Sequence, residues 1–405
     1  MVTIQSFVSD RSTPSPTSRA LIIGGGIAGT VAALALQRAD IKAVVYEAGG
    51  PAEPAKGPYL TIPANGLDAL AAIGMDDLVS AGGFATCATT FFNSGGKRVG
   101  MVGHARDSIT IRRGRLESWL QHAAVKRGIA FEFGKRIRAA TIIPRGVEAR
   151  FTDGSMADGE VLIGCDGVHS AVRRIIDPGA AAPRSGGPLN FCGHTASIAA
   201  GIPGQWQMVF GRRAFFGYAA DARGGTVWCA VVPRSEVPDN ASRSGSHDEW
   251  KQLLIGLVAG DRSPAAPLIV KGTLEMTADD TLDLPFVRRW HCGPLIVIGD
   301  AAHAAAPASD QGVSLAIEDG VLLAKHLRQL PAVPAFEAFE RARRRRVERI
   351  VAQGARSTRL RAPGPAGRLL RDLMLPTVFR YLMTERSLAW MHDHRVEWHQ
   401  PVVNG

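Results

Sequence analysis

The sequence reads LIIGGGIAGTVAALAL from residue 21 to residue 36, and VVYE follows at residues 44–47. This pattern predicts an apolar strand, a glycine turn, an alanine-rich helix and a second strand that ends in an acid, which is the order of a dinucleotide-binding βαβ unit. Gly24 allows the tight turn, Gly26 lets backbone approach a pyrophosphate, and Gly29 lets the helix pack closely on the sheet. The helix would begin at Ile27 and Ala28, with its free N–H groups facing the phosphates.

The acid at the end of the second strand strengthens this interpretation. Glu47 stands 18 residues after Gly29, close to the roughly 20-residue interval expected for an acid that binds a ribose hydroxyl. A glycine-rich turn alone would be weak evidence, because such turns also occur for structural reasons. With strand, helix, second strand and acid in register, the stretch predicts a nucleotide site.

Length and composition indicate the general class of protein. The chain has 405 residues, of which 46% are hydrophobic and 21% charged, so we expect a globular protein with two domains or one elaborated domain. Residues 1–18 are rich in Ser, Thr and Pro and lack the apolar core of a signal peptide, which predicts a disordered tail. We expect no membrane span and a cytoplasmic protein. The cysteines lack a CxxC pair and predict neither a disulfide framework nor a metal site: Cys87, Cys165, Cys192, Cys229 and Cys292.

The net charge of +10 is concentrated in the run RARRRR at residues 341–346. We interpret this run as a solvated face of a helix near the C-terminus. Nucleic-acid binding is not expected, because no recognition fold accompanies the run. Attraction of an anionic cofactor or substrate is the remaining alternative.

Two later segments repeat the pattern of a strand that runs into glycine and an acid. Residues 160–163 lead into Gly164-Cys165-Asp166-Gly167, and residues 294–298 lead into Gly299-Asp300. Taken alone, Asp166 could simply cap the helix that follows it. Ligands of open α/β sheets gather at the carboxyl ends of the strands, so we expect these turns to meet around one ligand.

Between residues 178 and 285 the pattern changes to successive strands with short turns, at 206–210, 215–218 and 227–232. This succession predicts an antiparallel sheet. Large apolar side chains on these strands are candidates for an apolar substrate pocket, although each could equally belong to the ordinary core. The candidates are Met208, Phe210, Phe216, Tyr218 and Trp228.

Together these stretches resemble the single-component FAD-dependent aromatic hydroxylases, the family of p-hydroxybenzoate and salicylate hydroxylases. The resemblance covers residues 20–350 and rests on three motifs: the glycine fingerprint at 24–29 with Glu47, the Asp-Gly motif at 165–173, and the Gly-Asp motif at 299–303 with Pro307. It implies that Asp166 serves FAD and pyridine nucleotide and that Asp300 holds the ribityl chain.

The resemblance also assigns residues near the flavin ring. Arg113 matches the family arginine that contacts the cofactor, although from spacing alone the arginines at 112, 113 and 115 could be surface charge. Pro307, Gly312 and Val313 would lie beside the isoalloxazine ring, and Pro307 would leave a small apolar space there.

The expected fold class is α/β, with a Rossmann-like FAD-binding domain, a mainly antiparallel β-sheet substrate domain and C-terminal helices. We assign residues 19–70, 105–177 and 286–330 to a discontinuous FAD-binding domain. Residues 71–104 and 178–285 would form the substrate-binding domain, and residues 331–405 a C-terminal helical region.

The implied function is that of an FAD-dependent monooxygenase. It would use NAD(P)H as a transient co-substrate and O2 to hydroxylate an aromatic or polycyclic small molecule through a flavin C4a-hydroperoxide. The protein would supply placement and electrostatics, with the helix N-terminus at Gly312 and Val313 stabilising negative charge on the flavin. No side chain is assigned as general base, and a monomer or homodimer is expected.

Two departures from the family pattern concern the last motif. Asp310-Gln311-Gly312 stands where the family usually has Gly-Gln-Gly, and Ser314 stands where asparagine is common. An inward carboxylate would oppose negative charge on the flavin. Two alternatives therefore stay open: a related flavoenzyme that performs epoxidation, reduction or oxidative rearrangement of a terpenoid or polyketide, and a non-catalytic flavin-binding protein.

Overall fold

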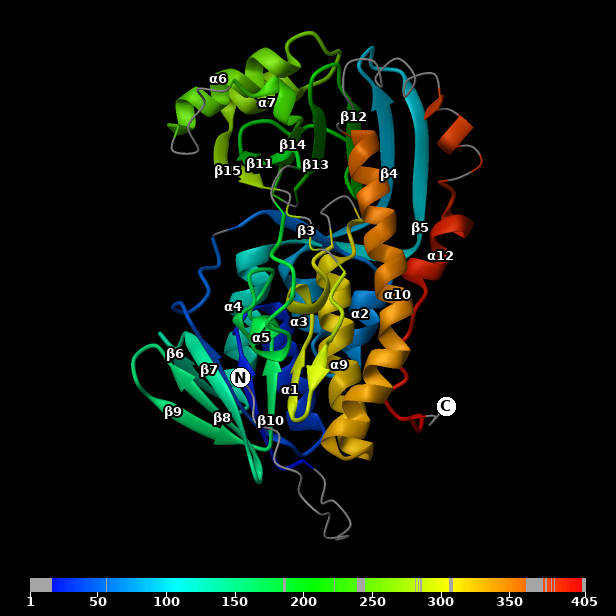
Figure 1. The fold of residues 1–405 in the computed structure, drawn as a ribbon. Helices are drawn as coiled ribbons and strands as arrows, with labels where there is room; N and C mark the ends of the chain where they lie inside the picture. The colour runs from blue at the N-terminus through cyan, green and yellow to red at the C-terminus, as the bar shows by residue number, and fades with distance from the viewer. Residues whose placement is uncertain are drawn as a thin grey trace.

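The central strand of the predicted nucleotide-binding layer is β1 (Arg19–Ile23), whose last four residues are buried. Parallel pairing on both sides of β1 builds a six-stranded sheet in the order β16-β17-β10-β1-β2-β6, with one antiparallel strand at its edge. The other strands are β2 (Lys42–Glu47), β6 (Ala130–Phe133), β10 (Val161–Gly164), β16 (His291–Cys292) and β17 (Leu295–Val297). Figure 1 shows this sheet in the lower part of the molecule. The computed structural model describes residues 17–55, 57–184, 187–221, 223–238, 245–280, 282, 284, 286–305, 309–361, 374–375, 377–379, 381 and 383–402.

Helices flank this sheet. The apolar helix α1 (Ile27–Arg38) packs against α9 (Gly312–Gln329) and α4 (Arg113–Lys126). Shorter helices complete the layer: α2 (Ala64–Ala71), α3 (Asp76–Gly82), α5 (Ala171–Ile176) and α8 (Asp300–His303). The predicted strand–turn–helix order at residues 21–36 and the helix predicted after Gly312 are both present.

Glycine permits the closest contacts of the first turn. Gly24 has a φ of 104°, a backbone conformation that favours glycine, and a Cβ there would overlap the carbonyl of Cys165. A Cβ on Gly29 would overlap the carbonyl oxygen of Gly24. Two glycines of the predicted fingerprint therefore serve packing between the turn, its helix and the neighbouring strand.

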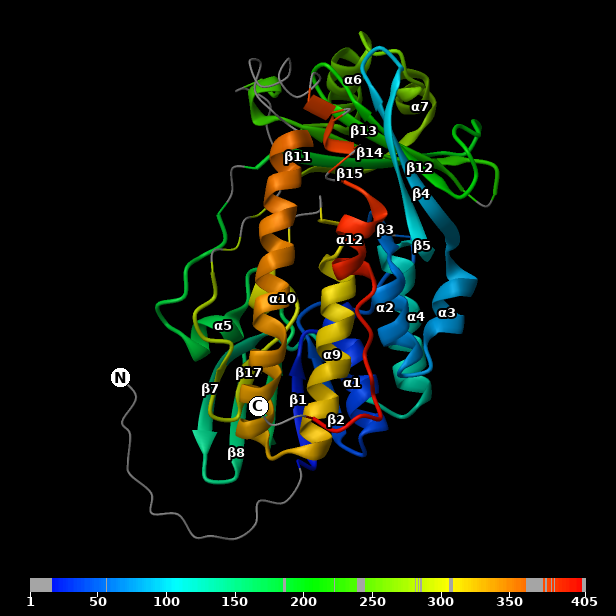
Figure 2. The same ribbon diagram turned by 90° about the vertical axis from the view of Figure 1, so that its right-hand side faces the viewer.

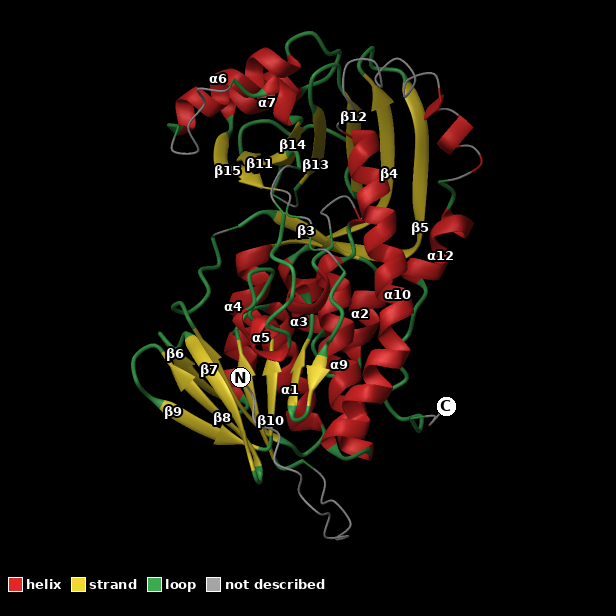
Figure 3. Ribbon diagram, viewed as in Figure 1, coloured by secondary structure: helices red, strands yellow, loops and turns green. Residues whose placement is uncertain are grey.

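A second, eight-stranded sheet forms the upper part of the molecule (Figure 3), in the order β15-β11-β14-β13-β12-β4-β5-β3. All its neighbours pair antiparallel except β12 and β4, so the sheet is mainly antiparallel, as predicted. Its strands are β3 (Tyr59–Ile62), β4 (Phe84–Asn93), β5 (Arg98–Arg112), β11 (Leu189–Thr195), β12 (Gln205–Phe210), β13 (Phe215–Ala220), β14 (Thr226–Val232) and β15 (Thr273–Asp280). Helices α6 (His247–Val258) and α7 (Ala265–Lys271) contribute to an apolar cluster with this sheet.

A small antiparallel sheet stands beside the nucleotide-binding layer. It consists of β7 (Ile137–Ile143), β8 (Gly146–Phe151) and β9 (Met156–Gly159). A 3-10 turn, η1 (Arg234–Glu236), follows β14. None of the helices among the described residues combines the length and the apolar composition needed to cross a bilayer.

Two helices of the C-terminal region lie along both the lower, six-stranded layer and the upper, eight-stranded sheet. Helix α10 (Ala332–Arg361) runs beside α9 and continues up to the eight-stranded sheet, and α12 (Glu385–His392) lies near it (Figure 2). The α/β fold class with C-terminal helices is confirmed. The division into domains stays a prediction, and β3 lies within the range 19–70 although it pairs in the upper sheet. Nearly all of the predicted tail, residues 1–16, lies outside the described residues.

We expect Gly29→Ala to lower the free energy of unfolding by about 1–3 kcal/mol, because the new Cβ meets backbone that cannot move without disturbing β1. Chemical denaturation followed by circular dichroism measures the change. Gly256→Ala on α6 is the matched control, since no atom lies within 4 Å of its Cβ, and it should raise stability by about 0.5–1 kcal/mol. Equal effects of the two variants would contradict the close packing at Gly29.

Candidate active site

The three predicted turns lie against one another. Strands β17, β10, β1 and β2 are parallel neighbours, so their carboxyl ends share one edge of the sheet. The first turn touches the second at Gly24 and Cys165, and a Cβ on Gly299 would lie 3.0 Å from the Cβ of Ala28. The three turns therefore form one continuous surface, as expected from the sequence.

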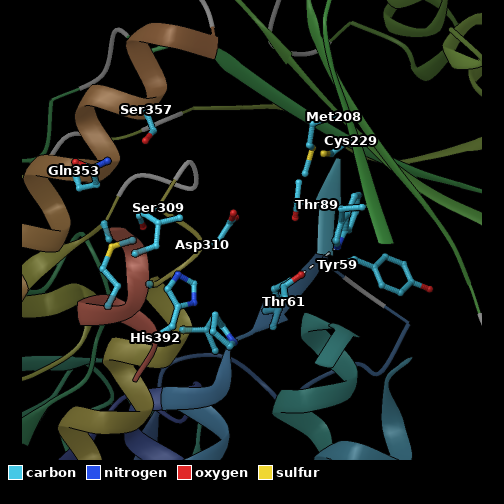
Figure 4. A pocket seen from close by; sticks show the side chains of 18 of the residues that line it. Tyr59, Thr61, Thr89, Met208, Cys229, Ser309, Asp310, Gln353, Ser357 and His392 are labelled. Atoms are coloured by element: carbon cyan, nitrogen blue, oxygen red, sulfur yellow. Dashed lines mark hydrogen bonds between the residues drawn. The ribbon is translucent and has the colours of Figure 1, made fainter. Parts of the chain in front are cut away.

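One cavity of about 970 Å³ extends from this edge to the underside of the eight-stranded sheet. At the sheet edge it touches all three turns and the start of α9, through Gly26, Ile27, Ala28, Cys165, Gly167, Asp300, Gly312 and Val313. Figure 4 shows its other end, where residues of the eight-stranded sheet, of the segment before α9 and of the C-terminal helices face one another.

Two helix N-termini open into this cavity. No side chain among the described residues caps α1 or α9, and neither helix has an acid in its first turn. A Cβ on Gly26 would meet nothing nearer than Glu117 Oε1 at 3.9 Å, so the backbone there is open to a ligand. Uncapped N–H groups and the positive helix end suit a pyrophosphate at α1 and a negatively charged ring edge at α9. The donor set therefore fits a flavin dinucleotide.

Two of the predicted acids bind backbone rather than line the cavity. Glu47 accepts hydrogen bonds from the N–H groups of Gly25, at 2.6 Å, and Gly49, at 2.7 Å. Asp166 accepts hydrogen bonds from the backbone N–H groups of Ala171, at 2.6 Å, and Val172, at 3.1 Å, and so caps α5. The capping alternative for Asp166 is thus observed, while its neighbours Cys165 and Gly167 reach the cavity.

Asp300 and Arg113 line the cavity itself. Burial raises the pKa of the Asp300 carboxyl, and the charges of His303 and Arg113 oppose that rise. Arg113 donates from Nε to Glu117 Oε1 at 2.9 Å. Its neighbour Arg112 instead forms a two-pronged ion pair with Glu275 of β15, at 2.7 and 2.8 Å. Arg113 therefore lines the cavity, whereas Arg112 connects β5 to β15 through its ion pair.

The predicted pocket residues divide between the two faces of the upper sheet. Met208 and Phe210 line the cavity. Phe216, Tyr218 and Trp228 do not; they belong to the cluster that packs against α6 and α7. Alternate residues of a strand point to opposite faces, and the antiparallel register places Phe216 opposite Val209 rather than Met208. The ring of Phe216 stacks on Trp228 with centroids 5.9 Å apart.

The C-terminal region supplies cavity residues that we did not predict. The ring of Phe379 lies 4.4 Å from that of Phe91 between centroids, and both line the cavity. Other wall residues come from α10 and α12: Gln353, Ser357, Leu388 and His392. Leu375, Phe379 and Met383 recur every four residues, the spacing of an apolar stripe on a helix. This pattern could have indicated from the sequence that the C-terminal region packs against other apolar residues.

Comparison with known proteins agrees with this geometry. Residues 17–353 match the model of the FAD binding domain family. The chain belongs to this family. It is 28% identical over 327 residues to the aurachin C monooxygenase/isomerase of Stigmatella aurantiaca, covering 77% of this chain and 82% of that protein. The FAD-dependent urate hydroxylase of Klebsiella pneumoniae is 29% identical over 325 residues, with the same coverage of 77% and 82%.

The fold of this FAD-binding domain protein is also that of solved structures. The structure of Klebsiella pneumoniae HpxO with FAD and uric acid superposes with a TM-score of 0.80 at 24% identity, covering 93% of this chain and 96% of that one. Membership of the FAD-dependent aromatic hydroxylase-like flavoproteins and FAD as cofactor are confirmed. Pro307, predicted beside the ring, lies outside the described residues.

A buried ionic cluster joins α9 to α10 beside this edge of the six-stranded sheet. Arg343 is only 1% exposed, and Glu318 and Asp319 are fully buried. Arg343 donates to Asp319 Oδ1 at 2.8 Å and to Glu318 Oε2 at 2.5 Å. Arg346 donates to Glu318 Oε1 at 2.9 Å. The interpretation of residues 341–346 as a solvated face was therefore wrong for these two arginines, which are drawn inward by paired carboxylates.

Asp319 also holds the turn that begins α8. Asp319 Oδ2 accepts a hydrogen bond from the Gly299 N–H at 3.0 Å and lies 2.5 Å from His303 Nε2. Burial alone would raise the pKa of Asp319, but the positive charges of His303 and Arg343 and the hydrogen bonds lower it to about 2. The ionised carboxylate thus fixes the turn that begins α8.

A second branch of the cluster reaches the start of α9. Asn65 Nδ2 donates to Glu318 Oε1 at 2.7 Å and to Gln311 Oε1 at 2.9 Å. Burial would raise the pKa of Glu318, whereas the charges of Arg343 and Arg346 lower it to about 2. The buried Gln311 is therefore oriented through a chain of hydrogen bonds that ends at α10.

The two departures from the family pattern lie at this start of α9. Asp310 lines the cavity and has a φ of 51°, in the left-handed region that favours glycine and that aspartate tolerates better than most residues. Ser314 is buried, and a Cβ on Gly66 of α2 would lie 2.6 Å from its Oγ. Serine at position 314 is smaller than the asparagine common in the family, and α2 packs closely on α9 at this point.

We expect Arg343→Met to reduce the free energy of unfolding at pH 7 by about 3–5 kcal/mol, because Glu318 and Asp319 lose a buried counter-charge. Carboxylates with lowered pKa values stabilise the fold at higher pH, so the deficit should shrink between pH 4.5, the ordinary pKa of a glutamate, and about pH 2. Denaturant titrations at several pH values measure this.

The exposed Arg345 of the same run provides the control for that variant. Arg345→Met should stay within about 0.5 kcal/mol of the parent. A comparable loss in both variants would show that Arg343 acts through general charge rather than through its buried pairs.

Proposed function

We propose that this protein is an NAD(P)H-dependent FAD monooxygenase that hydroxylates an aromatic or polycyclic small molecule. The observation that carries the proposal is the single cavity that joins the three FAD-type turns to an apolar chamber. When bound, FAD takes up hydride equivalents from NAD(P)H and activates O2, and the protein supplies binding, orientation and electrostatics.

The cofactor's polar half would be held by the sheet edge. The N-terminus of α1 at Gly26, Ile27 and Ala28 provides N–H groups for the pyrophosphate. Glu47 lies next to that turn and keeps carboxylate lone pairs for a ribose hydroxyl. Asp300 would accept hydrogen bonds from the ribityl chain.

The ring end would lie at the start of α9. The uncapped N–H groups at Gly312 and Val313 and the positive end of the helix stabilise negative charge on the ring edge that faces them. Arg113 also lines the cavity, where its positive charge acts on Asp300. Pro307 stays proposed as part of this environment from the family motif.

The chamber beyond the ring would exclude water and orient the substrate. Met208, Phe210 and Phe379 give it an apolar wall. The names of relatives fit an aromatic substrate: urate for the Klebsiella enzymes and 3-amino-4-hydroxybenzoate for an enzyme of Streptomyces cremeus, which is 28% identical over 326 residues. An aromatic ring system is therefore the substrate class that we propose.

The test begins with the purified protein. It should bind FAD, and aromatic or polycyclic compounds should accelerate its consumption of NADPH or NADH. Labelled O2 should place one labelled oxygen in the hydroxylated product. A product without label would support the reductive alternative, and bound FAD without reduction under any ligand would support a non-catalytic protein.

We expect Asp300→Ala to weaken FAD binding by about ten- to a hundredfold, the effect of losing one or two hydrogen bonds to a carboxylate. Titration of FAD fluorescence against the apoprotein gives the dissociation constant. Asp158→Ala, on an exposed strand of the small sheet, is the control and should bind FAD like the parent. Unchanged affinity in Asp300→Ala with an intact fold would remove Asp300 from the cofactor site.

A further inference from the structure

A row of residues on neighbouring strands crosses the cavity side of the eight-stranded sheet. Strand register places Met208 of β12 opposite Gly217 of β13, and Gly217 opposite Cys229 of β14. Cys229 in turn lies opposite Cys192 of β11, and Cys192 lies opposite Met276 of β15. The four members of this row that carry sulfur all line the cavity. The upper wall of the chamber therefore carries a row of sulfur side chains, which we call the sulfur row.

Gly217 lets two of these side chains meet over the middle of the sulfur row. A Cβ at this position would lie 2.6 Å from Met208 Sδ and 3.0 Å from Cys229 Sγ, so both sulfur atoms rest over the bare backbone of the glycine. Figure 4 shows Met208 and Cys229 next to each other on the cavity side of the sheet. Glycine inside a strand gives up packing and backbone entropy, and it often marks a close approach by another group. Here the two sulfur atoms make that approach.

The sulfur row is suited to contact with aromatic rings. Cys192 is 9% exposed, and burial raises the pKa of its thiol well above the ordinary value, so the thiol is uncharged. A protonated thiol behaves as a small apolar group, and the thioether of methionine is polarisable and adapts its shape. Thioether sulfur makes favourable contacts with aromatic rings, at a distance of about 5 Å. An aromatic ligand therefore gains contacts here that a saturated ligand of the same size does not.

The sulfur row is long compared with one aromatic ring. Neighbouring strands of a sheet lie about 4.7–4.9 Å apart, and four such steps separate Met208 on β12 from Met276 on β15, a span of roughly 19 Å. Beside Met208, the rings of Phe91 and Phe210 continue the wall. A single ring would touch only a few of these side chains, whereas fused rings can reach several of them at once.

We propose that the ring system of the substrate lies against the sulfur row, and that this surface favours planar fused-ring aromatic compounds over single rings and over saturated compounds of the same size. This inference rests on the proposed function and narrows its substrate class. The sulfur row belongs to the upper sheet, whereas the three FAD-type turns lie at the edge of the six-stranded sheet. A flat ligand on the row would thus face the part of the cavity that those turns line.

Paired Met→Leu substitutions test the contribution of sulfur, because leucine keeps a similar volume and apolar character. The ligands are 2-naphthol and its saturated analogue decahydro-2-naphthol, titrated into the FAD-loaded protein by isothermal titration calorimetry. Met208→Leu combined with Met276→Leu should weaken binding of 2-naphthol by about tenfold, since each lost sulfur–aromatic contact accounts for about threefold. Binding of decahydro-2-naphthol should change by less than about twofold, because the apolar contacts remain.

The matched control places the same substitutions on the outer surface. Met101 and Met156 are exposed and lie outside the cavity lining. Met101→Leu combined with Met156→Leu should leave the affinities for both ligands within about twofold of the parent values.

Gly217→Ala tests the shape of the sulfur row. The new methyl group would push Met208 Sδ and Cys229 Sγ toward the chamber. Because 2-naphthol uses more of this surface than phenol does, its binding should weaken by about tenfold and that of phenol by less than about threefold. Far-ultraviolet circular dichroism checks that the variant is folded.

Equal weakening of 2-naphthol and decahydro-2-naphthol in the paired Met→Leu variant would overturn the proposal, as would an unchanged affinity for 2-naphthol. A parent protein that binds phenol or decahydro-2-naphthol as tightly as 2-naphthol would also overturn it. Parent-like binding of 2-naphthol by folded Gly217→Ala would overturn the role of Gly217. Failure of the proposed function looks different: the FAD-loaded protein would keep its sulfur-dependent preference for 2-naphthol and yet consume no NAD(P)H with any ligand.

Discussion

The buried pairing of Arg343 with Glu318 and Asp319 joins the parts of this molecule that must act together. Helix α10 leaves the nucleotide-binding layer and carries Gln353 and Ser357 to the chamber wall, so its position sets that wall. Buried charges of this kind remain ionised only when their partners are in place. The same carboxylates bind Gly299 and Asn65, and α10 is thereby held to the turn before α8 and to α2.

In the half of the cavity at the six-stranded sheet, the groups that could bind FAD belong to the backbone more than to side chains. Parallel strands deliver three turns to one edge, and α1 and α9 point uncapped N-termini into the same cavity. Glu47 and Asp166 support this edge by binding backbone N–H groups. A polar dinucleotide therefore meets mainly fixed dipoles, which need no rearrangement when charge develops on the ring.

The cofactor half could be predicted from the sequence, because each motif is local and its spacing mirrors its strand and helix. The substrate half could not. Met208 and Phe216 are both apolar residues of strands, so the sequence does not distinguish them. Helices α6 and α7 cover one face of the sheet, which buries Phe216 in the core and leaves Met208 facing the cavity. Arg343 and Arg345 likewise differ only by which helix face meets Glu318. Pairings between distant segments leave little local signal.

Asp310 lies on the cavity wall just before α9, where the two halves meet. A non-glycine residue at a φ of 51° carries a backbone cost of order 1 kcal/mol, which persists only where the surroundings hold it. That conformation sets a carboxylate beside the uncapped end of α9, whose positive dipole offsets part of its charge.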